Sequence, residues 1–255
     1  MVFYDNDDHY NLYNSLISIG GKGLYILQGH TDSGKNVFLK DMLTRYSHDE
    51  GNYESITILS NTAEHTDDFD FLNDIGFPEP KITENLDDIK RIYIKLKIEK
   101  TNYVKKNKGD RKTLQKKWIE DHPTLFIFND FFSLANLSAP NNPVLKIVSD
   151  LRHVGGTIIL NTQSITGLNP NFYENSRMVI SFTCPERNIN KLKEKTSLVI
   201  DSRMKKIIQS WCSRKYYCTI WVINWFIDKP IPIYPLLVYP VQENKPLKIK
   251  KIKFH

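Results

Sequence analysis

Residues 29–36 read GHTDSGKN and follow the apolar run LYILQ at residues 24–28. The spacing G-x-x-x-x-G-K between an apolar strand and an amphipathic helix (residues 35–46) is typical of a phosphate-binding loop. Glycines let successive backbone N–H groups face a phosphate, and the helix N-terminus adds its positive dipole end. The alternative is a glycine-rich turn without a ligand. The residues predicted to bind a nucleotide, with the lysine at the β- and γ-phosphates, are Gly29, His30, Thr31, Asp32, Ser33, Gly34, Lys35 and Asn36.

Short apolar runs alternate with helix-length segments along the chain, which indicates an α/β fold with a mainly parallel sheet covered by helices on both faces. Helices are also predicted at 191–200 and 202–212, and a strand at 216–224. One domain is expected, with a core at about 22–185, a basic helical insertion at about 85–120 and a C-terminal extension at about 186–255. The predicted core strands cover residues 24–28, 56–60, 124–130, 157–163 and 178–183.

The run TLFIFND at residues 124–130 resembles a Walker B strand, in which apolar residues end in two polar groups. Asp130 falls at the position of the catalytic base, and Asn129 takes the position that normally holds Mg²⁺. Asn36 likewise replaces the hydroxyl residue that normally ligates this ion. The predicted metal ligands are therefore Asn36, Asn129 and Asp130. Because an amide oxygen is neutral, both asparagines should weaken the hold on Mg²⁺.

The run TIILNTQ at residues 157–163 is a third strand that ends in a polar residue. Gln163 can form hydrogen bonds with both a phosphate and a water molecule, so we predict that it senses the γ-phosphate. By itself the triplet NTQ is equally compatible with the start of a loop.

In this order, GHTDSGKN, LFIFND and LRHVGGTIILNTQSITGLNPNFYENSRMVISF resemble the FtsK–HerA superfamily of P-loop DNA translocases. Within it the pattern is most similar to the packaging ATPases of large DNA viruses, of the poxvirus type, and of related mobile elements. The resemblance implies an ASCE/RecA-like fold with the sensor strand between the Walker A and Walker B strands. It also implies a homo-oligomeric ring that pumps double-stranded DNA with ATP and Mg²⁺. By this resemblance Arg152 matches a position proposed to reach a neighbouring subunit's nucleotide as an arginine finger, and Arg177 is the second candidate. The alternative is that each is a surface or salt-bridging arginine.

The net charge of +6 is concentrated in residues 90–117, which hold twelve Lys or Arg against Glu99 and Asp110. This asymmetry favours a polyanionic partner, and double-stranded DNA before a membrane. The alternative is a solvated lysine-rich surface. Tyr93 and Tyr103 suit either stacking on bases or helix packing. Five lysines in the last eleven residues suit DNA, a capsid component or a virion membrane.

Three scattered cysteines indicate neither a metal framework nor a disulfide scaffold. The N-terminus has no signal-peptide profile, and the most apolar region is broken by charges and prolines. We therefore expect a location in the host cytoplasm (a virus factory) or the virion. The favoured function is a DNA-packaging ATPase. The alternatives are a nucleotide-binding assembly module with weak or no hydrolysis, and a translocase for DNA transfer or segregation.

Overall fold

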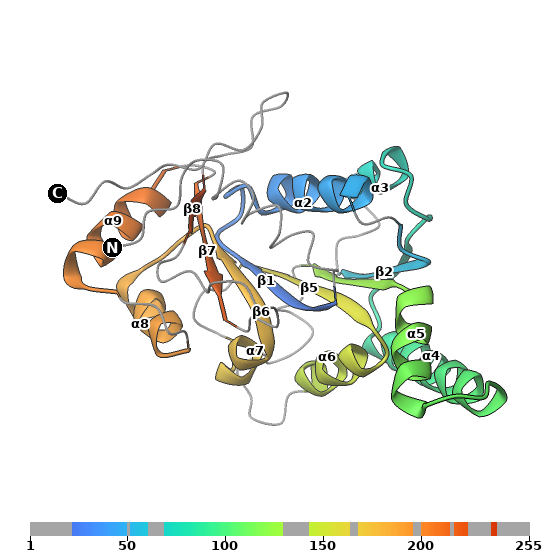
Figure 1. The fold of residues 1–255 in the computed structure, drawn as a ribbon. Helices are drawn as coiled ribbons and strands as arrows, with labels where there is room; N and C mark the ends of the chain where they lie inside the picture. Colours follow the sequence, from blue (N-terminus) through green and yellow to red (C-terminus); the bar gives the residue numbers. More distant parts are fainter. Residues whose placement is uncertain are drawn as a thin grey trace.

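A central sheet collects all strands of the described chain (Figure 1). The structure is a computed structural model that describes residues 22–49, 52–60, 69–129, 143–163, 168–195, 200–214, 217–223 and 236–238. Within these ranges the sheet has eight strands in the order β3-β2-β4-β5-β1-β6-β7-β8. Their bounds are β1 Gly23–Gln28, β2 Ser55–Ser60, β3 Lys81–Thr83, β4 Thr124–Asn129, β5 Gly156–Thr162, β6 Ser176–Ser181, β7 Cys218–Val222 and β8 Leu236–Val238.

The strands from β3 to β6 in this order are parallel to their neighbours, and β7 and β8 add an antiparallel edge. The strand β5 lies between β1 and β4. In that register Asn161 is the partner of Leu27 on one side and of Asn129 on the other. Because parallel strands end at the same edge, the loop after β1 and the ends of β4 and β5 meet there.

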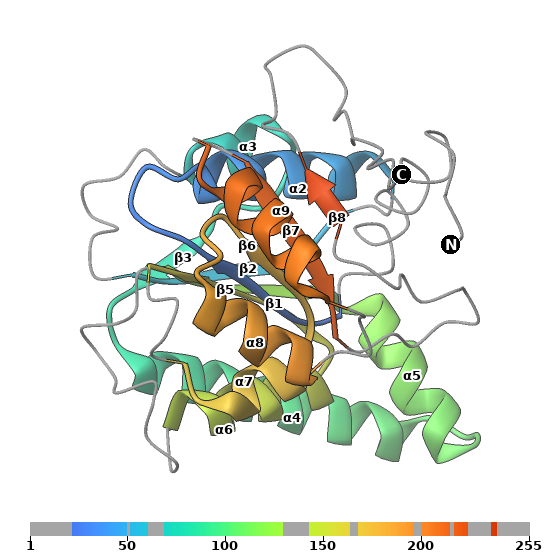
Figure 2. The ribbon, with the colours of Figure 1, turned by 90° about the vertical axis from the view of Figure 1, so that its left-hand side faces the viewer.

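Helices cover both faces of the sheet, with α2 and α3 on one side and α4, α6 and α7 on the other (Figures 1 and 2). Strand side chains alternate between two buried clusters, as the period of two requires. In β1, Leu24 and Ile26 join the cluster under α6, and Tyr25 and Leu27 join the cluster under α2. The helix bounds are α2 Lys35–Asp49, α3 Phe71–Asp74, α4 Leu86–Lys106, α5 Arg111–Asp121, α6 Pro143–His153, α7 Pro170–Asn175, α8 Glu186–Lys195 and α9 Ser202–Cys212.

The predicted fold class is confirmed, and one local prediction differs from the structure. The helix expected at 191–200 lies earlier, at Glu186–Lys195. Pro185 starts it, because its carbonyl accepts from the backbone N–H groups of Asn188 and Ile189. The sequence pattern also gave no sign that β7 turns antiparallel to β6 or that β8 extends the sheet. A short proline-rich run carries no periodic signal for such pairing.

The basic insertion folds into two helices, α4 and α5, as predicted for its basic half. Each begins at a polar cap: the side chain of Asn85 accepts from the backbone N–H of Asp87, and that of Asp110 accepts from Thr113. The buried indole of Trp118 joins α5 to the cluster under α6. No helix within the described ranges is both long enough and apolar enough to span a membrane.

Candidate nucleotide site

The glycine loop between β1 and α2 has the backbone of an anion-binding turn. Asp32 and Gly34 lie in the left-handed region, with φ of 58° and 100°. Such a turn directs backbone N–H groups into one concavity, and the N-terminus of α2 adds its dipole. Gly29 has no room for a side chain, since a Cβ there would lie 2.7 Å from Ser33 Oγ and 2.7 Å from Phe182 Cβ. The sequence GHTDSGKN is thus folded tightly against the sheet, and it is not an open turn.

Lys35 is the first residue of α2, and its ammonium group is held inside the loop. Its Nζ donates to the backbone carbonyls of Gly29 and His30, both at 2.9 Å, and the residue is 6% exposed. A buried ammonium group needs such oxygen partners. The ammonium group is therefore held against the loop backbone, as expected for a residue that contacts phosphate.

Gln163 follows directly after β5 and contacts the glycine loop. Thr31 Oγ1 donates to Gln163 Oε1 at 3.1 Å, and both side chains are solvent-exposed. The structure thus brings the predicted sensor residue next to the predicted phosphate loop. Asp130, the predicted base, lies outside the described residues.

Three asparagine amides meet beside the loop, on the face of the sheet covered by α2. Asn161 Nδ2 donates to Asn36 Oδ1 at 2.8 Å and to Asn129 Oδ1 at 2.7 Å. Asn161 is fully buried and Asn129 is 3% exposed. The buried Oδ1 of Asn161 has no hydrogen-bond partner among the described residues. Two of the three predicted metal ligands, Asn36 and Asn129, are thus joined through a third amide.

Among the described residues, Asn36 and Asn129 offer a Mg²⁺ ion only neutral amide oxygens. Mg²⁺ is held by oxygen ligands, and carboxylates and phosphates bind it best. Here the two candidate oxygens are neutral, and both already accept from the partially positive N–H groups of Asn161. The described part of the chain also contains no group of three or more His, Cys, Asp or Glu side chains suited to a metal.

Asn161 is a residue that the sequence analysis missed. It lies in β5 two residues after Ile159, which belongs to the cluster under α2, and residues two apart on a strand share a face. Its register opposite Asn129 places both amides side by side. The signal present in the sequence was the Asn in TIILNTQ, but pairing it with Asn129 required the strand order.

The fold resembles those of solved structures of other proteins. No model of a protein family and no curated protein matches the sequence. Solved structures do match: the genome-packaging NTPase B204 from Sulfolobus turreted icosahedral virus 2 in complex with AMP has a TM-score of 0.55 at 15% identity, covering 87% of this chain and 99% of B204. Its complex with ATP-gammaS gives 0.55 at 14% identity with the same coverage. The DNA-packaging ATPase B204 from Sulfolobus turreted icosahedral virus gives 0.53 at 15% identity, covering 86% and 98%.

The chain has the P-loop NTPase fold. The strands predicted to carry the P-loop (β1), the sensor (β5) and the Walker B residues (β4) are adjacent in the order β4-β5-β1. This is the strand order that the resemblance to the FtsK–HerA superfamily implies.

The two predicted arginine fingers lie at the opposite edge of the sheet from the P-loop. Arg152 is near the end of α6, before β5 begins, and its Nη1 donates to the backbone carbonyl of Asn175 at 3.3 Å. Arg177 is the second residue of β6 and packs against Gly23, the first residue of β1. A strand of seven residues such as β5 is about 23 Å long. Neither guanidinium therefore reaches the P-loop of its own chain.

Proposed function

We propose that this protein is an ATP-driven translocase of double-stranded DNA that packages a viral genome. The observation that carries the proposal is the convergence of Lys35, Gln163 and Asn129 at one edge of three adjacent strands. They meet in a P-loop NTPase fold that B204, a genome-packaging NTPase, shares over nearly its whole length.

The nucleotide in this proposal is ATP, with its phosphates at the P-loop N–H groups and at Lys35. The Mg²⁺ that accompanies ATP is held weakly, because Asn36 and Asn129 offer neutral oxygens that already accept from Asn161. Slow turnover follows from this amide cluster. The same observation favours the second candidate function, a nucleotide-binding assembly module that hydrolyses poorly.

Phosphate release with and without double-stranded DNA separates the two candidates. The wild type should hydrolyse ATP faster with DNA, and Lys35→Ala and Asp130→Asn should abolish that stimulation. The matched control is Lys40→Ala, an exposed lysine one turn further along α2 that should leave the rate unchanged. Nucleotide binding without phosphate release above background in the wild type would exclude the motor and leave the assembly module.

The proposal includes a ring in which Arg152 or Arg177 acts on the neighbouring subunit's nucleotide. Their position at the far edge of the sheet supports action between subunits, since they do not reach their own P-loop. Mixing two inactive variants tests this: Arg152→Ala and Lys35→Ala subunits in one ring create some interfaces with both groups intact. Partial recovery of ATPase activity is expected. Mixtures as inactive as either variant alone would remove Arg152 from this role, and the same test applies to Arg177→Ala.

Genome packaging is the task of B204, and the same motor chemistry would serve DNA transfer or segregation. In this proposal the protein works in the host cytoplasm or at the virion, against a capsid or virion membrane component. In an infection with the Lys35→Ala variant, we expect the genome to replicate normally and the capsids to remain empty. Filled capsids would contradict the packaging task.

A further inference from the structure

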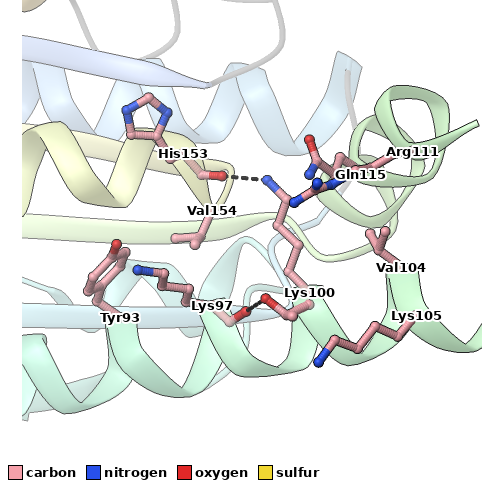
Figure 3. Close-up of a pocket in the computed structure, with 10 residues that line it drawn as sticks. Tyr93, Lys97, Lys100, Val104, Lys105, Arg111, Gln115, His153 and Val154 are labelled. Carbon is pink, nitrogen blue, oxygen red and sulfur yellow. Dashed lines mark hydrogen bonds between the residues drawn. The ribbon is translucent and has the colours of Figure 1, made fainter.

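A pocket of about 490 Å³ lies between α4, α5 and the end of α6 (Figure 3). Its lining is strongly basic, and no Asp or Glu occurs among the described residues that form it. Lysines come from α4, Arg111 and Gln115 from α5, and His153 and Val154 from the end of α6. The cationic lining residues are Lys97, Lys100, Lys105, Arg111 and His153.

Four cations of residues 90–117 form an ion pair with a carboxylate three or four residues away on the same helix. The carboxylate offsets the charge of its cation locally. These pairs are Lys90–Asp87, Arg91–Asp88, Lys95–Glu99 and Lys116–Glu120. None of these four cations lines the pocket. The pocket therefore gathers cations whose charge is not offset in this way.

The pocket is built by specific contacts of its lysines. Lys100 Nζ donates to the backbone carbonyl of His153 at 2.6 Å and so joins α4 to the end of α6 (Figure 3). Lys97 Nζ lies 5.8 Å from the centre of the Tyr93 ring, a cation–π contact that holds its ammonium near the pocket. Burial lowers the pKa of Lys100 below its ordinary value, because it disfavours the charged form. A bound anion would offset that penalty.

We propose that this pocket binds the phosphate backbone of double-stranded DNA. Lys97, Lys100 and Lys105 lie on one face of α4 and span about 12 Å along its axis, at 1.5 Å per residue. Each strand of duplex DNA carries a negative charge about every 3.4 Å along the axis, so that span faces about three successive phosphates of one strand. A single small anion would leave part of the row without a partner.

The pocket lies at the opposite edge of the sheet from the P-loop, because Val154 and His153 come just before β5 begins. DNA bound there does not compete with nucleotide. The inference rests on the proposed function for its choice of duplex DNA as ligand. The inference goes beyond that function because it assigns the DNA contact to the pocket face of the basic insertion. The four cations that form ion pairs on their own helix lie outside this contact.

The test compares two charge-matched triple variants of the full chain by anisotropy of a labelled duplex at a series of salt concentrations. The pocket variant is Lys97→Gln, Lys100→Gln and Arg111→Gln. The control is Lys106→Gln, Lys112→Gln and Lys117→Gln, three exposed residues of the same two helices outside the pocket. Each lost phosphate contact lowers the slope of log K against log salt by about 0.9, so the pocket variant should lose about 2 to 3 and the control less than about 1.

A double variant, Lys97→Gln with Arg111→Gln, keeps the Lys100–His153 hydrogen bond and should still lower the slope by about 1 to 2. Equal losses in the pocket and control variants would overturn the inference, because they would indicate a diffuse charge effect. Sodium tripolyphosphate that binds more tightly than the duplex, and only when the pocket is intact, would also overturn it. Failure here is distinct from failure of the motor: pocket variants should bind nucleotide like the wild type, and phosphate release without DNA should be unchanged.

Discussion

Asn161 donates from one amide nitrogen to both Asn36 and Asn129, so its replacement by alanine should loosen the P-loop from the ends of β4 and β5. Each lost hydrogen bond contributes about 1 kcal/mol to stability. The buried Oδ1 of Asn129 would then lack this donor, which costs about a further 1 kcal/mol, and removal of the unpartnered Oδ1 of Asn161 offsets about as much. The expected loss is about 2 kcal/mol, or about 4–8 °C in melting temperature for a chain of this size.

A double-mutant cycle shows whether the three amides act together. Asn161→Ala paired with Asn36→Ala, and paired with Asn129→Ala, should each show a coupling of about 1 kcal/mol. Coupling between Asn36 and Asn129 should vanish once Asn161 is alanine, because Asn161 joins them. The assay is thermal unfolding without nucleotide or Mg²⁺.

The matched control for this cycle is Asn188→Ala in α8. Asn188 is also buried, at 2% exposed, but neither atom of its amide has a hydrogen-bond partner among the described residues. The Asn188→Ala substitution removes the same side-chain atoms as Asn161→Ala but no side-chain hydrogen bond. The free energy of unfolding should therefore change less than in Asn161→Ala. Additive effects at Asn36, Asn129 and Asn161, within about 0.3 kcal/mol, would refute the amide cluster.

Three further predictions concern the metal position, a tight turn and a buried thiol. The pair Asn36→Thr with Asn129→Asp should tighten Mg²⁺ binding in the nucleotide complex, measured by Mg²⁺ titration of a fluorescent ATP analogue; unchanged affinity would contradict the neutral-amide argument. Gly155→Ala should destabilise the fold by about 2–4 kcal/mol in chemical denaturation, because φ is +83° and its Cβ would lie 2.6 Å from Ile119 Cγ2. Burial raises the pKa of the Cys218 thiol, so Cys218 in the folded protein should resist a thiol reagent at pH 8. This thiol's contribution to stability should fall as pH rises past about 8.5, where only the unfolded thiol ionises, which a comparison with Cys218→Ala isolates; rapid labelling of Cys218 in the native state, located by mass spectrometry, would refute this.

Much of the fold could be predicted because its signals are local. The apolar run before GHTDSGKN and the helix after it define the first β-loop-α unit by periodicity and glycine spacing. The predicted limits of the core strands agree with the structure to within two residues. The start of α8 and the antiparallel β7 could not be predicted in this way. A strand's direction depends on its neighbours in the sheet, and β7 pairs with β6 across a long stretch of chain.

The sequence by itself determined the chemistry that is available: a phosphate loop with Lys35, a polar residue at the end of each neighbouring strand, and a dense run of cations. Only the tertiary structure decided which of these groups act together. Strand order placed Asn161 between Asn36 and Asn129 and made one neutral cluster of residues far apart in the chain. Helix packing selected the cations that face the pocket. The physical reason is that hydrogen bonds and charges act over a few ångströms, and only folding sets those distances.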